Sequence, residues 1–393
     1  MERAGGSMHA NNGAVTVLVA HPSAELYGSD KMVLESAVGM SREGCSVIVT
    51  VPTTGPLVEE LAVHGIPVVL CPTPVLRKSL LSPRGALVLL RESVAGLVGG
   101  LRLIRQHRPD VVYVSTITLP LWFLLAKISR RPIVAHVHEA EGSASKFLRT
   151  ALAAPLALAG SILVNSRFSA TVQEQAFRPL QGRLKVVYNG VAGPPEIVPP
   201  REALTGGLKL LYVGRLSHRK GVDVAVGALA ELRRRGLEVS LDIVGAVFPG
   251  NEAFLDGLHA MVEQQGLAGD IRFHGYQSSI WPFLEQADIC VVTSRFDEPF
   301  GNTAVESLLA ARPLIVSDTS GLREAAEGYR SSLFVAPDNV SQLADAVEVV
   351  DAAWRDYRDW ALEDAGVAAA KHSIDAYQRA VAQEVQEAAG APR

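Results

Sequence analysis

The sequence predicts an α/β protein made of two doubly wound, Rossmann-like domains, and two observations support this. Short apolar runs rich in Val, Ile and Leu alternate with amphipathic helical segments along most of the 393 residues. Repeated βα units of this kind form parallel sheets that helices cover on both faces. The alternation is interrupted at residues 193–207, where Pro and Gly accumulate without a hydrophobic period. Such a stretch is typical of an interdomain linker.

The first domain is expected to span residues 13–192. Its strands are predicted from the apolar runs at residues 15–20, 46–51, 66–71, 111–115, 132–138, 161–166 and 184–190. Helices are expected between them, including one that follows Gly28 and a long basic segment before the fourth strand. Residues 1–12 are polar and lack the apolar segment of a signal peptide, so we expect a disordered tail there.

The second domain is expected to span residues 208–372 and to repeat the alternation. Its strands are predicted at residues 208–214, 239–245, 271–275, 287–292, 314–316 and 333–335. Helices are again expected between the strands. From Leu343 onward the chain is predicted to be helical, with breaks at Gly366 and at residues 372–373.

Charge is unevenly distributed along the chain. Residues 1–200 hold 19 Lys and Arg against 13 Asp and Glu, a net +6, and the remainder holds 18 against 28, a net −10. The cations that concentrate between residues 77 and 108 are Arg77, Lys78, Arg84, Arg91, Arg102, Arg105 and Arg108. Interleaved with apolar segments, they fit peripheral contact of residues 77–108 with an anionic membrane. The alternative is a solvated helix face whose apolar side packs on the sheet.

Several classes of partner and site are not expected. No run of about 18 apolar residues is free of charge, so no membrane-spanning helix is predicted. No nucleic-acid-binding motif accompanies the basic stretch, so nucleic acid is not expected as a partner. Cys45, Cys71 and Cys290 are scattered without CxxC spacing, which indicates buried, reduced thiols in a cytoplasmic protein.

The most informative stretch is residues 291–324, where an apolar strand leads into a loop and then a helix. Glu298 and Glu306 frame the turn between loop and helix. Across this bend they cannot form an i,i+4 pair, and can instead contact two parts of one elongated ligand. The helix start between them offers backbone N–H groups to an anion. Its residues are Phe300, Gly301, Asn302 and Thr303. This order suits a sugar, a diphosphate and a ribose laid end to end.

The stretch resembles the E-x7-E signature of the retaining glycosyltransferases of family 4, which have the GT-B fold. The matching positions are Glu298, Pro299, Phe300, Gly301, Glu306, Arg312, Pro313, residues 314–316, Ser317, Asp318, Gly321 and Glu324. Ala311 departs from the pattern, because the family often has glycine there. The resemblance implies two Rossmann-like domains facing a cleft, with a last helix that crosses back. Residues 373–393 are therefore assigned to the first domain.

The resemblance also implies roles for the two carboxylates. Glu298 would hold the donor sugar and support the positive charge that develops at its anomeric carbon, and Glu306 would hold the nucleotide ribose. A carboxylate beside the anomeric carbon could serve as a nucleophile. The family instead favours a same-face displacement in which the leaving phosphate helps to take the acceptor proton.

A second motif spans residues 213–221. A strand ends at Gly214, and Arg215 and Lys220 follow in the loop before a helix. Two cations beside a helix start suit a leaving diphosphate, because negative charge builds there as the glycosidic bond breaks. The family carries an Arg and a Lys at these places, so the resemblance assigns diphosphate binding to Arg215 and Lys220.

The loop after the first strand matches the family less well. Family members often have two glycines there, whereas Tyr27 replaces the first and leaves Gly28 as the position where backbone can approach a phosphate. The alternative is an ordinary βα turn. No GxGxxG follows the first strand, which argues against a dinucleotide-dependent dehydrogenase.

Four further residues are of interest: His136, His138, Tyr276 and Asn189. His136 and His138 end the fifth strand on one face, without a third ligand at recognisable spacing for zinc. The resemblance places His138 near the transferred sugar; the alternative is a hydrogen-bonded core histidine. Tyr276 is interpreted either as a contact to the nucleotide base or as a half-buried loop aromatic. Asn189 is interpreted as part of the interdomain hinge rather than of the chemistry.

Together these features predict a glycosyltransferase that moves a sugar from a nucleotide diphosphate-sugar, with retention, to a glycan, lipid-linked or small-molecule acceptor. Cell-envelope polysaccharide or glycolipid synthesis is the expected context, with Glu298 and His138 as the catalytic residues. No cofactor is expected beyond that co-substrate. No Asp-x-Asp ends a strand, so metal independence is predicted. The alternatives are a sugar-nucleotide epimerase of the same fold and a GT-B protein that binds without turnover.

Overall fold

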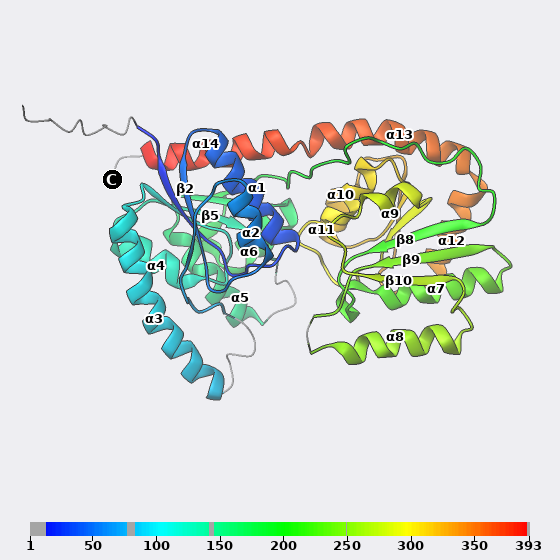
Figure 1. The fold of residues 1–393 in the computed structure, drawn as a ribbon, viewed down its shortest axis with the longest axis horizontal. Helices are drawn as coiled ribbons and strands as arrows, with labels where there is room; N and C mark the ends of the chain where they lie inside the picture. The colour runs from blue at the N-terminus through cyan, green and yellow to red at the C-terminus, as the bar shows by residue number, and fades with distance from the viewer. Residues whose placement is uncertain (1–12, 77–82, 141–144, 249, 391–393) are drawn as a thin grey trace, which may run out of the picture.

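The computed structural model describes residues 13–76, 83–140, 145–248 and 250–390, and the side chains of residues 83–88 are not described. The tail predicted at residues 1–12 and the first part of the basic stretch, residues 77–82, lie outside the described residues. Within these ranges the chain folds into two α/β domains joined by a linker and by helices along one side (Figure 1).

The first domain holds seven parallel strands in the order β3-β2-β1-β4-β5-β6-β7. These strands are β1 (Thr16–Ala20), β2 (Ser46–Val51), β3 (Val68–Leu70), β4 (Val111–Val114), β5 (Ile133–Val137), β6 (Ser161–Val164) and β7 (Leu184–Val186). The helices that accompany them are α1 (Gly28–Arg42), α2 (Pro56–Val63), α3 (Pro83–His107), α4 (Pro120–Ile128), α5 (Lys146–Ala153) and α6 (Arg167–Ala176).

The second domain holds six parallel strands in the order β10-β9-β8-β11-β12-β13. These strands are β8 (Leu208–Val213), β9 (Val239–Val244), β10 (Ile271–Gly275), β11 (Ile289–Val292), β12 (Leu314–Ser317) and β13 (Ser332–Val335). The helices are α7 (Val222–Arg234), α8 (Glu252–Gln264), α9 (Trp281–Gln286), α10 (Asn302–Leu309), α11 (Ser320–Ala326), α12 (Val340–Ala352), α13 (Trp354–Lys371) and α14 (Ile374–Gly390).

Each sheet separates two apolar cores because successive side chains of a strand point to opposite faces. In β1, Val17 and Val19 pack toward α1 and α14, whereas Leu18 and Ala20 pack toward α3 and α4. All four are fully buried. Strands covered on both faces have no solvated side, which is why the sequence shows continuous apolar runs here instead of alternation.

The strand order also locates the cleft. In both sheets the order reverses at the first strand of the domain, between β1 and β4 and between β8 and β11. Loops that follow the two strands at such a point run to opposite faces and leave a crevice, where ligands of doubly wound sheets bind.

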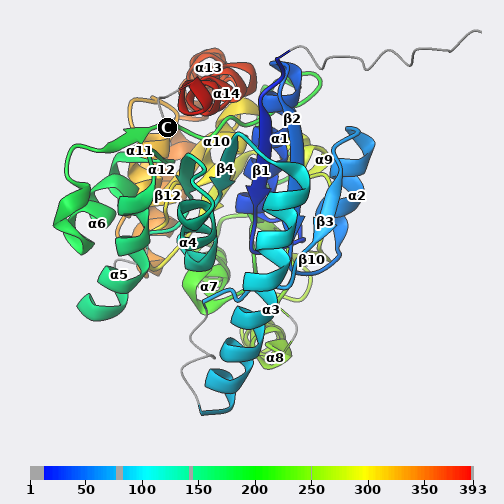
Figure 2. The ribbon, with the colours of Figure 1, turned by 90° about the vertical axis from the view of Figure 1, so that its left-hand side faces the viewer.

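The last two helices run along the top of the molecule from the second domain to the first (Figures 1 and 2). Helix α14 packs on α1, and Tyr377 Oη lies 2.7 Å from Ser36 Oγ at this contact. Gly39 permits the close approach, because a Cβ there would lie 2.6 Å from Cβ of Gln378. The expected return of the last helix to the first domain is thus confirmed.

Two sequence expectations need comment. The break predicted at Gly366 is wrong, because Gly366 lies inside α13. The break predicted at residues 372–373 is confirmed between α13 and α14, and a further interruption lies at Ala353. A glycine with open space around it is tolerated in a long helix at a modest cost. The three cysteines are free and buried, as predicted. No helix within the described ranges is both long and apolar enough to cross a membrane.

Two glycine substitutions should change stability in opposite directions. Gly39→Ala places a methyl group against the backbone of α14 and should lower the free energy of unfolding by about 1–3 kcal/mol. Gly366→Ala is the matched control, because a Cβ there meets nothing within 4 Å, and it should raise stability by about 0.5–1 kcal/mol. Urea denaturation measures both, and equal effects of the two changes would contradict the proposed α1–α14 contact.

Candidate functional site

A cavity of about 450 Å³ lies between the two domains at the carboxyl ends of the strands. Its walls come from the loops after β1, β5, β8 and β11 and from the start of α10. The structure brings all the sequence-predicted site residues to this cavity: Gly28, His138, Arg215, Lys220, Glu298, Phe300, Gly301, Asn302, Thr303 and Glu306.

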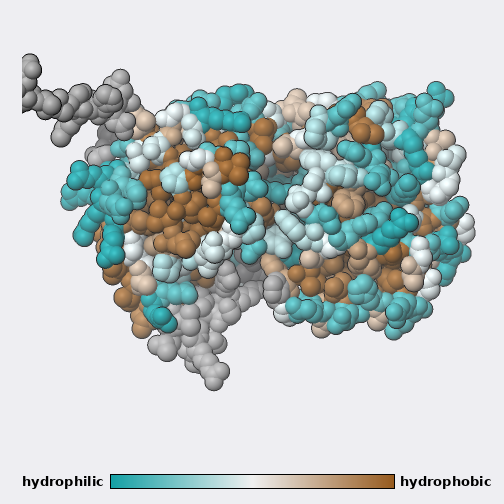
Figure 3. Space-filling view, viewed as in Figure 1, coloured by the Kyte–Doolittle hydropathy of each residue, from teal (hydrophilic) through white to brown (hydrophobic). Residues whose placement is uncertain are grey.

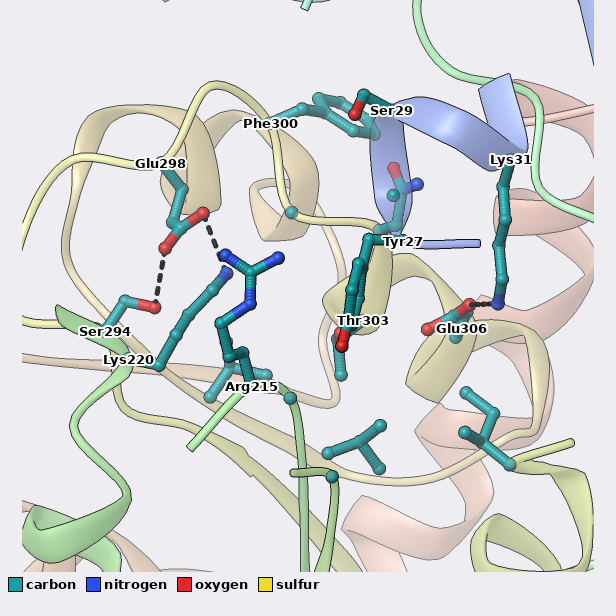
Figure 4. Close-up of a pocket in the computed structure, with 18 of the residues that line it drawn as sticks. Tyr27, Ser29, Lys31, Arg215, Lys220, Ser294, Glu298, Phe300, Thr303 and Glu306 are labelled. Atoms are coloured by element: carbon teal, nitrogen blue, oxygen red, sulfur yellow. Dashed lines mark hydrogen bonds and ion pairs between the residues drawn. The ribbon is translucent and has the colours of Figure 1, made fainter. Parts of the chain in front are cut away.

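Glu298 forms an ion pair with Lys220 inside the cavity. The Nζ of Lys220 is 2.9 Å from Oε2 of Glu298, and the hydroxyl of Ser294 donates to Oε1 at 3.0 Å (Figure 4). Glu298 is buried, with 7% of its surface exposed. Partners of this kind compensate the cost of burying a carboxylate. The two motifs that carry Lys220 and Glu298 are therefore in direct contact. Ser294 was not identified from the sequence, because a loop serine has no distinctive spacing.

The loop that carries Glu298 is fixed by contacts behind the cavity. Arg295 binds Asp223 at the start of α7 through two hydrogen bonds of 2.7 and 2.6 Å. At Gly221, where φ is +64°, a Cβ would lie 2.0 Å from the carbonyl oxygen of Thr293. At Gly321 a Cβ would lie 1.9 Å from the carbonyl oxygen of Glu298. Glycine is therefore required at both positions for this loop to pack as it does.

Arg215 points into the cavity beside Lys220 (Figure 4). Its guanidinium carbon lies 3.4 Å from the ring centroid of Phe248 and 4.5 Å from that of Tyr27. Its Nε is buried without a hydrogen-bond partner among the described residues. Burial lowers the pKa of Arg215, against the opposing effect of Tyr27 and Asp30. With Lys220 it concentrates positive charge where the sequence predicted a diphosphate.

The start of α10 faces the same space. Gly301 adopts φ +126°, which favours glycine, and precedes the helix whose first residues are Asn302 and Thr303. The amide of Asn189 donates to Oδ1 of Asn302 at 2.7 Å across the domain boundary. Asn189 lines the cavity, so interpreting it as hinge alone understated its position. The buried Phe300 ring stacks on Tyr188, with centroids 5.9 Å apart.

Glu306 lies at the other end of the cavity from Glu298, with Arg215 and Tyr27 between them (Figure 4). Lys31 of α1 reaches across from the first domain, its Nζ 4.0 Å from Oε1 of Glu306. Burial raises the pKa of Glu306, and the ammonium of Lys31 opposes this effect. The two carboxylates thus sit apart at the ends of a positively charged centre, in the order that the sequence predicted.

His138 lines the cavity from the first domain, and its two ring nitrogens are buried without a hydrogen-bond partner among the described residues. Burial, and next the neighbouring His21, lowers the pKa of His138 to about 3. His136 lies behind it with ring centroids 4.2 Å apart, and its Nδ1 is 2.6 Å from Tyr113 Oη. The alternation prediction is confirmed for both. His136 has a partner on Nδ1 and leaves only its buried Nε2 without one among the described residues, whereas His138 has no such partner on either ring nitrogen beside the cavity.

Gly28 begins α1, and Tyr27 and Ser29 line the cavity beside it. Tyr276 also lines the cavity but keeps 52% of its surface exposed, so both interpretations of this residue stay open. Among the residues that the structure describes, no group of three or more His, Cys, Asp or Glu side chains could hold a metal ion. Metal independence stays a prediction.

Contacts across the cleft join the two domains close to the loop that carries Glu298. The hydroxyl of Ser166 donates to the carbonyl oxygen of Pro299 at 2.5 Å. Glu324 accepts from the backbone N–H groups of Arg167 and Phe168, at 2.8 and 3.1 Å, and so caps α6 of the other domain. An acidic group at a helix start is favourable. This gives Glu324 of the sequence motif a structural position, which spacing alone did not indicate.

His372 lies behind the cavity, at the junction of α13 and α14. It is buried, with its ring centroid 5.6 Å from that of Phe300. Burial, and next the charge of Lys371, lowers the pKa of His372 to about 4. The sequence indicated only a helix break at His372. The contact between His372 and Phe300 joins residues that are far apart in the chain, so the sequence did not indicate it.

Comparison with known families places both halves of the chain. Residues 27–192 match the family model described as Glycosyltransferase Family 4, and residues 194–360 match the one described as Glycosyl transferases group 1. The glycogen synthase of Mycobacterium tuberculosis is 31% identical over 263 residues, which cover 63% of this chain and 61% of that protein. The human alpha-1,3/1,6-mannosyltransferase ALG2 is 25% identical over 363 residues, covering 85% of this chain and 86% of that protein. The aligned part thus spans only about three fifths of the mycobacterial relative.

Solved structures resemble the whole chain. Anabaena Alr3699/HepE, in a complex with UDP and glucose, superposes with a TM-score of 0.79 at 21% identity, covering 94% of this chain and 99% of that one. A glycosyltransferase from Rickettsia africae gives the same TM-score at 17% identity, with coverage of 96% and 100%. At such identities the likeness concerns the fold.

The buried His372 predicts a specific pH dependence of stability. Its folded-state pKa of about 4 lies below the ordinary value of 6.5, so between these values the unfolded chain binds the proton and the folded chain does not. Stability is therefore lost as pH falls from 6.5 toward 4. His372→Asn should make this decline shallower, as measured by urea denaturation across that range. The exposed His64, replaced in the same way, is the control, and an unchanged slope in His372→Asn would contradict the assignment.

Proposed function

Because the chain belongs to the glycosyltransferases of family 4, with a group 1 domain as its second half, we propose that it transfers a sugar from a nucleotide diphosphate-sugar to an acceptor with retention of anomeric configuration. Its two facing Rossmann-like domains form the expected GT-B fold. One observation carries the proposal. The Lys220–Glu298 ion pair and Arg215 lie together in an interdomain cavity that also holds Glu306.

The donor is proposed to lie along the cavity with its sugar at Glu298 and its ribose at Glu306. Its diphosphate lies between them, against Arg215, Lys220 and the start of α10. Diphosphate oxygens gain negative charge as the glycosidic bond breaks, so fixed cations and helix N–H groups stabilise the transition state more than the ground state. These groups supply the charge compensation, and the proposed reaction uses no metal and no cofactor besides its co-substrate.

Retention follows from the side of attack. Glu298 stabilises the positive charge at the anomeric carbon, and the acceptor hydroxyl attacks from the face that the diphosphate leaves. The acceptor oxygen forms the new bond, the anomeric C–O bond to phosphate breaks, and the departing phosphate oxygen takes the acceptor proton. His138 is neutral at neutral pH, because its pKa is lowered to about 3. Its ring is proposed to form hydrogen bonds with the donor sugar. The UDP and glucose of the Anabaena structure support a nucleoside diphosphate donor.

The acceptor is proposed to be lipid-linked or part of a cell-envelope glycan, reached at the cytoplasmic face of a membrane. Helix α3 supports this with an exposed apolar stripe flanked by arginines. The exposed apolar side chains are Leu90, Val94, Leu97 and Val98, and the exposed cations are Arg91, Arg102, Arg105 and Arg108. Figure 3 shows brown apolar and teal hydrophilic side chains side by side at the lower left edge, over α3. Such a surface matches an anionic lipid interface.

A donor panel tests the proposed function. Saturating UDP-, GDP- or dTDP-sugar should raise the melting temperature of the protein for the matching nucleotide, because a ligand that binds only the folded state stabilises it. Glu298→Gln should retain this shift but lower transfer by about 100-fold or more, since it removes charge stabilisation needed only in the transition state. Glu285→Gln, an exposed carboxylate on α9, is the matched control.

Three outcomes would contradict the proposal. No shift with any nucleotide would remove the donor site, and full turnover in Glu298→Gln would remove its catalytic assignment. A new sugar isomer formed from donor alone would indicate an epimerase instead, because that reaction needs no acceptor.

The membrane contact is tested with vesicles. The protein should sediment with vesicles that contain phosphatidylglycerol and not with pure phosphatidylcholine, and added salt should weaken the binding. Arg102→Glu/Arg105→Glu should abolish sedimentation at unchanged donor binding. Arg272→Glu/Arg355→Glu, the same change of charge at exposed sites of the second domain, is the control. Equal loss in the two double variants would show a net-charge effect without an α3 interface.

A further inference from the structure

Tyr27 places an aromatic ring of the first domain on a cation of the second. The guanidinium of Arg215 lies in the corner between the rings of Tyr27 and Phe248, at 4.5 and 3.4 Å from their centroids. The two rings meet edge to face, with centroids 5.7 Å apart and planes at 71°. Cations bind favourably to aromatic faces, and more strongly when water is excluded. Phe248 belongs to the same domain as Arg215. Only the contact between Tyr27 and Arg215 therefore depends on how the two domains are arranged.

Arg215 differs from Arg295, the partly buried arginine on the loop that carries Glu298. Arg295 is bound by Asp223 and Asp338, and its charge is neutralised within the protein. The guanidinium of Arg215 forms no ion pair with a described residue, and its buried Nε has no partner there. Contacts on the faces of a guanidinium leave its N–H edge free for a planar or bidentate anion. The two rings thus orient Arg215 without consuming its hydrogen-bonding capacity.

The position of Tyr27 is itself fixed by buried hydrogen bonds. Its backbone N–H donates to Oδ2 of Asp30 at 3.0 Å. The other oxygen of Asp30 lies 2.8 Å from Nε2 of His21, and Nδ1 of His21 lies 2.7 Å from Oγ of Ser115. Asp30, His21 and Ser115 are buried. The start of α1 is therefore anchored to the ends of β1 and β4, and with it the backbone that carries the ring.

We infer that Tyr27 is a positioning residue, which holds Arg215 toward the donor diphosphate through a cation–π contact across the cleft. The inference rests on the proposed function for the identity of the anion. It adds that the orientation of Arg215 depends on domain closure, because Tyr27 and Arg215 belong to different domains. A glycine at position 27 would provide no such contact, because it has no side chain.

The size of the effect follows from the strength of the contact. A desolvated cation–π contact corresponds to roughly a 5- to 30-fold change in an equilibrium or rate. Tyr27→Leu keeps an apolar side chain without a ring face and should lower kcat/KM for the donor by about tenfold. The loss should fall mainly on kcat, because Arg215 acts most strongly on charge that develops in the transition state. Tyr27→Phe keeps the ring and should stay within about twofold of the wild type.

A double-mutant cycle on the full chain distinguishes positioning from a general structural role. If Tyr27 acts through Arg215, Tyr27→Leu should have no further effect once Arg215→Met is present. The cycle is measured for donor turnover and for the affinities of UDP, GDP and inorganic pyrophosphate. The affinities still give a coupling energy where the turnover of a variant is too low to measure. Phe334→Leu is the matched control, because it removes another cation–π contact of the second domain. There the guanidinium carbon of Arg323 lies 4.8 Å from the ring centroid of Phe334. Melting temperatures of all variants check folding.

The outcomes separate this inference from the proposed function. Absence of nucleoside diphosphate binding by the wild type would overturn the proposed function. With binding present, the positioning role of Tyr27 is overturned if Tyr27→Leu matches the wild type or if Tyr27→Phe loses as much activity as Tyr27→Leu. It is also overturned if Tyr27→Leu lowers activity by the same factor with and without Arg215. Loss in Tyr27→Leu that is rescued in Tyr27→Phe and absent in the Arg215→Met background supports it.

Discussion

The ion pair between Lys220 and Glu298 is the contact on which the rest of the site depends. At 2.9 Å it joins the loop after β8 to the loop after β11, the two loops that flank the point where the second sheet reverses its strand order. A buried carboxylate without its cation is costly, because its charge is then uncompensated. Both loops are therefore fixed from behind, by Arg295 on Asp223 and by glycines that let backbones touch.

Domain closure is the second constraint, because the cavity has walls from both domains. Lys31 reaches Glu306, Asn189 donates to Asn302, and Glu324 caps α6 from the opposite domain. These polar contacts are individually modest, since such bonds exchange with water when the domains part. Helix α14 adds the apolar counterpart by packing on α1 and continuing from α13. The relative position of the two domains is thus fixed by the packing of α14 on one side and by water-exchangeable polar contacts beside the cavity.

Sequence patterns predicted the fold and the residues that gather at the interdomain cavity, whereas they predicted the surroundings of those residues poorly. Strands that are buried on both faces appear in the sequence as unbroken apolar runs. The spacing of Glu298 and Glu306 across a helix start is also distinctive. By contrast, Gly366 gives the same local signal in a helix as at a break, and the helix continues through it at the modest cost of one interior glycine. Ala311, the residue that departs from the resembling family's motif, has φ +55°. Burial of its methyl group accompanies this left-handed conformation, which residue type alone disfavours.

By itself, the sequence determined the two-domain α/β architecture, the strand positions and which charged groups are candidates for binding a diphosphate, because periodicity and spacing are local properties of a chain. Only the tertiary structure decided which of those groups meet. Lys220 and Glu298 are far apart in sequence, as are Tyr27 and Arg215, and their contacts arise from strand order and domain closure. The stacking of Phe300 against His372 has the same origin. Such contacts depend on how sheets and helices pack in three dimensions, and no pattern along a single chain specifies that packing.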